Sequence, residues 1–366
     1  MKIIIAPDKF KGSLTSLEVC NAIEEGIRKN GKKIDLIKFP MADGGDGFNS
    51  VLQHYFHTSM VTVDTVDPLG RPMTASYQWN AQEKIAIIEM ATASGLVLLN
   101  QRERNPMLTS TVGTGILVSH AIGQGAGRIV LGLGGSATND AGIGILAALG
   151  FRFIDAAGEE LTPVGASLLK IDQIIPPATL PPVHFEIAAD VENPLHGPAG
   201  AAFVYGPQKG ADAEMVTQLD LGLRNFAALI ASRFGKQVAG FPGAGAAGGI
   251  AAGLAAFFEV EMKKGVDLVL KANGLEKELP GATLIITGEG KIDNQSGSGK
   301  VVGTMAALAK KYGIPCIAFC GISDADPAEL NELGLSAAYP LKAGGLSLNE
   351  SMTQAYSLLV LSLIHI

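Results

Sequence analysis

Ile129 to Gly150 reads IVLGLGGSATNDAGIGILAALG, and this stretch decides the fold class. The apolar residues 128–133 predict a β-strand, and the small, apolar residues 141–149 predict a helix after a glycine-rich turn. Strands that pass through tight turns into helices are the units from which α/β domains are built. The sequence therefore predicts an α/β protein around this turn.

The glycine-rich turn also predicts a binding site for phosphate. Gly132, Gly134 and Gly135 are expected to leave backbone N–H groups uncovered where the helix begins. Unpaired amides and the positive end of the helix dipole both favour an anion. Ser136 and Thr138 add hydroxyl groups beside the same turn. The expected ligand is therefore a phosphorylated molecule.

Short strands and helices also alternate from the N-terminus. The apolar residues 2–6 and 34–39 predict strands, and a predicted helix follows each of them. The loops PDKFKGS, residues 7–13, and MADGGDG, residues 41–47, then lie at the carboxyl ends of parallel strands. Open α/β sheets bind their ligands at that edge, although a charged loop is also compatible with a solvated turn.

A change of pattern divides the chain into two predicted domains. Strand-like runs at 61–66, 73–79 and 85–90 are separated by turns, which is typical of an antiparallel or mixed sheet. The alternating pattern returns near residue 283, and 366 residues exceed the roughly 250–300 that one core accommodates. The predicted domains are a discontinuous one, residues 1–62 with 283–366, and an inserted one, residues 63–282.

The overall composition limits the classes of protein and partner. The net charge is -7, without the clustered Lys and Arg that nucleic-acid binding requires. No apolar run reaches the ~20 residues of a membrane span, and the N-terminus lacks the apolar core of a signal peptide. The three cysteines fit buried thiols. We expect a cytoplasmic monomer or homodimer without nucleic-acid or membrane partners.

Carboxylates recur at the ends of predicted strands. Asp43 follows the second strand, Asp190 ends another, and Glu289 and Asp293 follow a third. Each of them alone is also explained as a turn, capping or surface residue. Their shared position favours a functional site, in which carboxylates hold a hard cation together with phosphate oxygens.

A nicotinamide-dependent hydroxy-acid dehydrogenase is the alternative that the same turn allows. Gly132, Gly134 and Ala137 fit G-x-G-x-x-A, and Asp155 lies at about the distance of a ribose-binding carboxylate. Against this alternative, the strand falls in the middle of the inserted domain, and no His or Tyr has an obvious acid–base position. The hydroxyl, amide and carboxylate groups of residues 136–140 instead suit phosphoryl transfer.

Two weaker patterns have structural explanations. His54 and His57 lie three residues apart on a predicted helix without further ligands nearby, so we expect surface or partly buried histidines. Gly243, Gly245 and Gly248 also fit the dinucleotide pattern. A proline precedes them instead of a strand, which favours close helix packing over cofactor binding.

Eight blocks of sequence, in order along the chain, carry a resemblance to a known family. They are APDKFKGSLTS, PMADGGDG, DPLGRP, GLGGSATNDAG, AADVENPL, YGPQKGA, PGAGAAGG and TGEGKIDNQS. Together they resemble the bacterial type I glycerate kinase family over nearly the whole chain. The resemblance implies ATP-dependent phosphorylation of D-glycerate, usually to 2-phosphoglycerate, with Mg²⁺, in glyoxylate or sugar-acid breakdown. It also implies a flavodoxin-like parallel-sheet domain split in sequence around an inserted mixed-sheet α/β domain.

Phosphoryl transfer assigns roles to the charged loops. The reaction requires a hydroxyl aligned with the γ-phosphorus and neutralised charge on the transferred group. Asp43 is the expected base or hydroxyl-orienting group, with Asp190 as the second choice. The expected Mg²⁺ ligands are Asp190, Glu289 and Asp293, because Mg²⁺ prefers oxygen.

The two substrates have separate expected contacts. The ATP phosphates are expected to meet Gly132, Gly134, Gly135, Ser136 and Thr138, with Lys300 in support. The GSGK segment that ends at Lys300 is not a Walker A loop, but a lysine reaches phosphate as a point charge. The glycerate carboxylate is expected to bind Lys9, Lys11, Ser13 and Arg71. We expect the substrate to lie between the domains, so that their closure excludes water.

Overall fold

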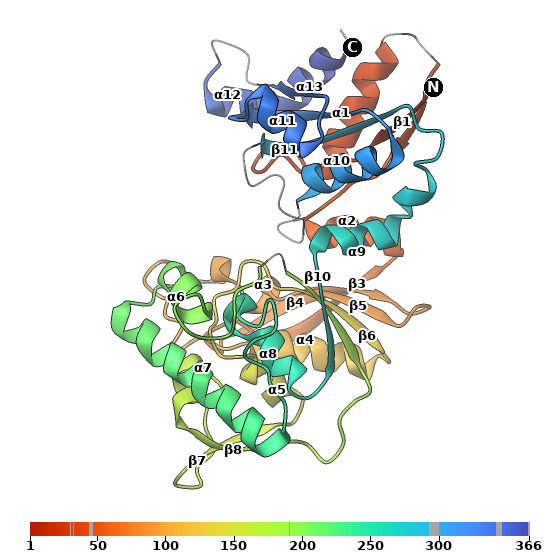
Figure 1. Ribbon diagram of the computed structural model, residues 1–366. Coiled ribbons are helices and arrows are strands. Elements are labelled where there is room, and N and C mark those ends of the chain that lie inside the picture. The colour runs from red at the N-terminus through yellow and green to blue at the C-terminus, as the bar shows by residue number, and fades with distance from the viewer. Residues whose placement is uncertain are drawn as a thin grey trace. The chain divides into compact units, whose positions relative to one another are not determined.

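The protein consists of two compact units, each with its own sheet (Figure 1). A computed structural model describes residues 1–29, 31, 33–43, 47–189, 191–292, 300–341 and 346–364. The first unit combines Met1–Tyr55 with Lys264–Ile366, and the second is Phe56–Lys263. The sequence places these junctions later, after residues 62 and 282. The earlier first junction follows from β3, Ser59–Val66, which pairs along its whole length inside the second sheet.

The first unit contains a five-stranded parallel sheet. Its strands are β1 Lys2–Ile5, β2 Asp35–Lys38, β11 Leu284–Ile292, β12 Cys316–Ser323 and β13 Ala337–Pro340. Their order across the sheet is β13-β12-β11-β1-β2, and every neighbouring pair is parallel. Counted within the unit this is the order 2-1-3-4-5 of flavodoxin-like sheets, so the predicted fold class is confirmed. The strand order reverses between β1 and β11, which makes this point of the sheet the expected ligand crevice.

The helices of the first unit bury the two faces of that sheet. They are α1 Ser16–Lys29, α2 Phe48–Phe56, α9 Gly265–Asn273, α10 Val301–Tyr312, α11 Pro327–Leu333, α12 Leu348–Thr353 and α13 Ala355–Leu363, with the short 3₁₀ turn η5 Leu275–Lys277. On one face, Ile3 and Ile5 of β1 join Val19 and Ile23 of α1 and Leu359 of α13 in one buried cluster. The start of α1 is fixed by a local hydrogen bond, since the Thr15 N–H donates to Glu18 at 2.8 Å.

The second unit contains a six-stranded mixed sheet, as predicted. Its other strands are β4 Pro72–Asn80, β5 Ile85–Glu89, β6 Arg128–Gly132, β9 His184–Ala188 and β10 Glu259–Lys263. The order is β10-β9-β6-β5-β4-β3. The first three strands in sequence form an antiparallel meander, whereas β5, β6, β9 and β10 run parallel. A separate antiparallel pair consists of β7 Arg152–Asp155 and β8 Ile171–Ile175.

One face of the second sheet is covered by helices α4, α5, α7 and α8 (Figure 1). The helices of this unit are α3 Ala91–Ser94, α4 Val112–Gly123, α5 Ile143–Ala148, α6 Ala201–Tyr205, α7 Ala213–Phe234 and α8 Ile250–Ala255, with 3₁₀ turns η1 Leu96–Leu98, η2 Gly165–Lys170, η3 Pro207–Lys209 and η4 Ala246–Gly248. Leu131 and Phe185 from the sheet pack with Leu223 of α7 and Leu254 of α8 in the main core. These burials position the loop after β6.

The three cysteines are buried free thiols, as the composition predicts. Burial raises the pKa of Cys316 and of Cys320 to about 12, so these two thiols stay protonated at neutral pH. Among the described residues, no helix combines the length and the apolar character that crossing a bilayer requires.

Candidate functional site

Charged residues meet at the switch point of the first sheet. Asp8 and Lys9 follow β1, Asp43 follows β2, and Glu289 lies in β11. The Asp8 N–H donates to the Gly288 carbonyl at 2.8 Å, so the loop after β1 runs beside β11. The sheet therefore gathers three carboxylates and one lysine from three segments that are distant in sequence.

The charges of this cluster are unevenly balanced. Lys9 Nζ lies 3.5 Å from Asp43 Oδ1 and 3.7 Å from Asp8 Oδ1. Burial of Asp8 raises its pKa to about 7, an effect that Lys9 opposes and that the carboxylates of Asp43 and Glu289 reinforce. Two or three carboxylates facing one ammonium provide the oxygen ligands and the excess negative charge that suit a hard cation.

A cavity of about 430 Å³ adjoins the cluster inside the first unit. The predicted substrate residues Lys9, Lys11 and Ser13 all line it, so the structure brings these three together. Ser13 uses its hydroxyl hydrogen within the unit, since Oγ donates to the Met352 carbonyl at 2.7 Å. His54 of α2 lines the same cavity. Helical spacing alone does not show that His54 faces the loop after β1, which is why the sequence assigned it no role.

The glycine-rich turn of the second unit presents a short exposed tip. Gly132 ends β6 and is buried, whereas Gly134 and Gly135 are exposed. Gly135 has a φ of +73°, a conformation that favours glycine. Ser136 is 9% exposed and Thr138 is fully buried. Of the residues predicted to meet phosphate, the two tip glycines are therefore the ones most accessible to a ligand.

The helix after this turn is shorter than the sequence predicts. It begins at Ile143 instead of residue 141 and has only six residues. The buried carboxylate of Asp140 accepts hydrogen bonds from the Gly142 N–H at 3.1 Å and from the N–H and hydroxyl of Thr111 at 2.8 Å each. The N-cap residue of this helix is Gly142, which makes no side-chain cap bond, and a contribution of the helix dipole to phosphate binding stays a prediction.

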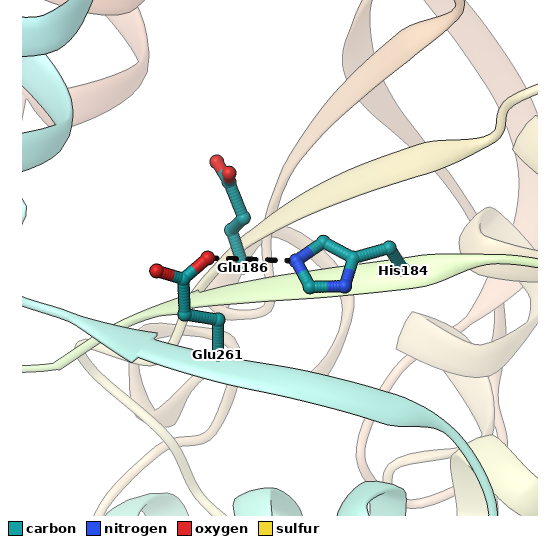
Figure 2. A group of neighbouring side chains, drawn as sticks. All are labelled: His184, Glu186 and Glu261. Carbon is teal, nitrogen blue, oxygen red and sulfur yellow. Dashed lines mark ion pairs between the residues drawn. The ribbon is translucent and has the colours of Figure 1, made fainter.

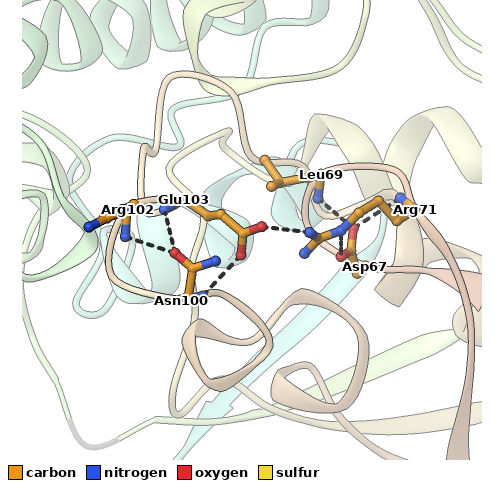
Figure 3. A network of polar contacts seen from close by, with 6 residues as sticks. All are labelled: Asp67, Leu69, Arg71, Asn100, Arg102 and Glu103. Atoms are coloured by element: carbon orange, nitrogen blue, oxygen red, sulfur yellow. Dashed lines mark hydrogen bonds and ion pairs between the residues drawn. The ribbon is translucent and has the colours of Figure 1, made fainter.

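Arg71, a predicted ligand of glycerate, belongs to a polar network of the second unit (Figure 3). Its Nε donates to Asp67, and its Nη1 donates to Glu103 at 2.7 Å. Glu103 is held in turn by the N–H of Asn100 at 3.0 Å. These bonds fix the guanidinium at a half-exposed position and use two of its five N–H donors.

The structure argues against both dinucleotide patterns. Asp155 ends β7, which pairs with β8 outside the main sheet, whereas a ribose-binding acid follows a strand beside β6. The Asp155 carboxylate accepts the Ala157 and Glu159 amides in a local turn. A Cβ on Gly248 would lie 2.3 Å from the Thr138 carbonyl oxygen, so this glycine serves close packing, as the sequence favoured. The dehydrogenase alternative therefore has no structural support.

Three further predicted residues complete the comparison with the sequence. Lys300 precedes α10 in the first unit, next to the N-terminus of that helix. Asp190 and Asp293, the other predicted Mg²⁺ ligands, lie outside the described residues. Of the predicted carboxylates, Asp43 and Glu289 are thus placed at the switch point.

A second group of possible metal ligands lies on β9 and β10 (Figure 2). Ligand atoms of His184, Glu186 and Glu261 lie within 4.8 Å of one another. Lys263 Nζ, however, lies 2.7 Å from Glu186 and 2.9 Å from Glu261. Since an ammonium already pairs with both carboxylates, this group needs no ion for charge balance.

Comparisons with known proteins agree along the whole chain. The model of the glycerate kinase family matches residues 3–365. The glycerate kinase of Halalkalibacterium halodurans is 43% identical over 360 residues, which cover 98% of this chain and 95% of the relative. The glycerate 2-kinase of Escherichia coli K12 is 40% identical over 359 residues, which cover 97% and 94%. A crystal structure described as a glycerate kinase 2 from Salmonella typhimurium LT2 gives a TM-score of 0.88 at 39% identity, covering 100% of this chain and 96% of that one.

Proposed function

The chain belongs to the glycerate kinase family, and from that premise we propose that it transfers the γ-phosphoryl group of ATP to D-glycerate with Mg²⁺. One observation carries the proposal beyond the family: Asp8, Lys9, Asp43 and Glu289 meet at the switch point beside a cavity. Kinases need little covalent chemistry from the protein and depend on positioning and charge neutralisation. A mixed cluster of acids and a lysine supplies both.

Glycerate is assigned to the cavity of the first unit. Lys9 and Lys11 line it and are proposed to hold the substrate carboxylate, and Ser13 is proposed to join them by turning its hydroxyl from the Met352 carbonyl to the substrate. Arg71 is proposed as a further carboxylate ligand, because its fixed guanidinium keeps N–H donors beyond those used for Asp67 and Glu103. A three-carbon acid needs several such contacts because it offers little apolar surface for binding.

Asp43 is the proposed base or hydroxyl-orienting group, with Asp190 as the second choice. The side chain of Asp43 is 25% exposed and stands beside Lys9, so a small substrate can reach it. A carboxylate within hydrogen-bond reach of the acceptor hydroxyl aligns the attack and takes up the proton. The transferred group then meets an oxygen whose lone pair points at phosphorus.

Mg²⁺ is proposed to bind through Glu289, with Asp190 and Asp293. Glu289 is 7% exposed, and it lies near enough to Asp8 to raise the pKa of that carboxyl. Hard oxygen donors and excess negative charge fit the ion. When bound, Mg²⁺ would neutralise charge on the transferred phosphoryl group.

The ATP phosphates are assigned to the turn after β6. Gly134 and Gly135 are exposed there and are proposed to offer their backbone N–H groups, whereas Gly132, Ser136 and Thr138 are buried parts of the same turn. Lys300 is proposed as an additional phosphate contact, because an ammonium on a flexible stem reaches phosphate oxygens.

We propose the 2-hydroxyl as the acceptor, following the name of the Escherichia coli relative. A ³¹P spectrum of the product decides the position without reference compounds. Phosphate on C2 couples to one carbon-bound proton and gives a doublet, whereas phosphate on C3 couples to two and gives a triplet. A triplet would show that the 3-hydroxyl is the acceptor and would contradict the proposed 2-hydroxyl.

A coupled assay of ADP release tests the whole proposal. Purified protein is supplied with ATP and, separately, D-glycerate, hydroxypyruvate and several sugar acids. We expect ADP release that requires glycerate, stops on chelation of divalent cations and returns with Mg²⁺. ADP release that is independent of glycerate, or none with any acid, contradicts the proposal.

The proposed setting is the cytoplasm, where reducing conditions keep buried cysteines such as these as thiols. A monomer or a homodimer remains our proposal for the assembly, and the mass of the purified protein in solution decides between them.

A further inference from the structure

A lysine lies inside the second unit, directly behind the glycine-rich turn. Lys209, the last residue of η3, is 2% exposed. Its Nζ donates to the Thr138 carbonyl at 2.7 Å. Lysines are almost never fully buried unless they are paired, because removing an ammonium from water is costly. The position of Lys209 therefore needs an explanation beyond packing.

The charge of Lys209 has a partner in Asp140. Burial lowers the pKa of Lys209 to about 7, and the charge of Asp140 opposes that shift. Asp140 is itself fully buried and is bonded to Thr111 and Gly142. Both ionisable groups thus fix the same backbone segment. Lys209 binds the carbonyl of Thr138, and Asp140, two residues later, bonds to Thr111.

The gripped segment is the continuation of the exposed tip. The Ala137 N–H donates to the Ser94 carbonyl at 3.0 Å, and the Ala137 carbonyl accepts from Thr109 at 2.8 Å. At the next residue, Thr138, the backbone carbonyl accepts the hydrogen bond from Lys209. Each residue from 137 to 140, other than Asn139, is therefore tied to a different part of the unit.

The side chains of Thr138 and Asn139 do not anchor the segment in place of the Lys209 hydrogen bond. Thr138 Oγ1 and both amide atoms of Asn139 are buried, and they find no hydrogen-bond partner within the described part of the chain. Gly248 also packs closely against the Thr138 carbonyl, and the Gly248 carbonyl accepts from the Ala141 N–H at 2.9 Å. Because Thr138 and Asn139 lack side-chain anchors among the described residues, Lys209 is the side chain that holds the backbone at position 138, between the bonds of Ala137 and those of Asp140.

We infer that Lys209 is a positioning residue, which holds the backbone at Thr138 so that Gly134 and Gly135 present their amides to the phosphates of ATP. The inference rests on the proposed function. Lys209 touches no substrate in this arrangement, since it is buried behind the turn. Its effect is therefore expected on nucleotide affinity, with little change in the chemical step.

Steady-state kinetics of two variants test this role. Lys209→Met removes the donor, and Lys209→Gln keeps a shorter, neutral donor in case the first variant does not fold. We expect the KM for ATP to rise about tenfold in Lys209→Gln, with kcat and the KM for glycerate within about threefold of wild type. Lys236→Met, at an exposed lysine of the same unit, is the matched control and should leave all three values unchanged.

Amide hydrogen exchange on the same proteins separates positioning from general stability. Faster exchange confined to residues 133–142 in Lys209→Gln supports the inference, because the rest of the unit keeps its protection. An unchanged KM for ATP overturns it, and so does exchange that rises equally in α7. A wild-type protein that binds no ATP contradicts the proposed function instead, whereas the exchange pattern still reports whether Lys209 holds the turn.

Discussion

Both units contain buried aspartates, and the surroundings of Asp8 in the first unit and Asp140 in the second differ. Asp8 in the first unit accepts the Lys9 N–H at 2.7 Å and faces two further carboxylates. Asp140 in the second unit accepts the Thr111 N–H, the Thr111 hydroxyl and the Gly142 N–H, and it lies near Lys209. Burial raises the pKa of both carboxyls.

This difference suggests separate roles: the charge of Asp8 belongs to the proposed reaction site, and that of Asp140 stabilises the fold. The hydrogen bonds of Asp140 compensate its charge within the unit, so it can fix a turn without any ligand. The neighbouring carboxylates disfavour the charged form of Asp8 and Lys9 opposes them only in part, so a bound cation or a proton would stabilise this site. Variants of the first site should therefore lose activity first, and variants of the second should lose stability first.

The largest expected effect is the loss of stability in Asp140→Ala. Removing this buried carboxylate leaves three donors without their acceptor and Lys209 without a nearby opposite charge, at a cost of about 3–5 kcal/mol. Urea unfolding followed by circular dichroism measures this change. Asp172→Ala, at an exposed position of β8, is the control and should shift the midpoint little. An Asp140→Ala protein as stable as wild type would show that Asp140 does not stabilise the second unit.

Asp43→Asn should reverse that pattern. We expect kcat to fall ~10²-fold or more, because the amide cannot accept the proton of the substrate hydroxyl. The unfolding midpoint should stay near that of wild type, since the side chain is partly exposed. The ADP-release assay and the same urea titration report the two quantities. Asp35→Asn, exposed at the start of β2, is the control, and normal turnover in Asp43→Asn would move the base to another residue.

Gly248→Ala tests whether the packing around the turn is as close as the architecture requires. The new Cβ would meet the Thr138 carbonyl oxygen at 2.3 Å, and the φ of +76° adds strain. We expect a loss of about 2 kcal/mol in stability. Gly125→Ala has a φ of +96° but no atom within 4 Å of the new Cβ, so it isolates the cost of the backbone conformation. Equal losses in the two variants would show that contact with Thr138 is unimportant.

The smallest effect is a gain of stability in Asp8→Asn that depends on pH. The pKa of Asp8 is raised to about 7 in the folded chain and is near 3.8 when unfolded. The folded state therefore binds more protons than the unfolded state between these values, and the aspartate destabilises the protein increasingly up to pH 7. With divalent cations chelated, Asp8→Asn should raise Tm by about 2 °C or more at pH 8, and not at pH 4. A uniform shift at both pH values would argue against buried charge as the cause.

Local signals in the sequence predict the elements of both units well. The long helix α7 carries such signals at both ends, since Asp212 caps its start by accepting from Met215 and Gly235 ends it at a φ of +69°. The mixed sheet follows from the turns between its first strands. In contrast, the helix predicted from residue 141 begins at Ile143, since Ala141 adopts a positive φ where the segment packs on the turn at Gly248.

Long-range partners explain what the sequence does not predict. Lys209 lies in the block YGPQKGA, yet no periodicity shows that its side chain is buried or that it binds a carbonyl 71 positions earlier in the chain. The partners of Arg71 are equally hidden, because Glu103 comes from a distant loop. Strand-end carboxylates were identifiable because parallel strands bring their carboxyl ends to one edge.

The central position of β1 in its sheet has a consequence for folding during translation. β1 pairs with β2 on one side and with β11 on the other, and β11 is synthesised only after the entire second unit. During translation the N-terminal segment must therefore wait with one strand edge unpaired, while Phe56–Lys263 emerges as a continuous stretch. The nascent chain is thus expected to complete the second unit before the sheet of the first.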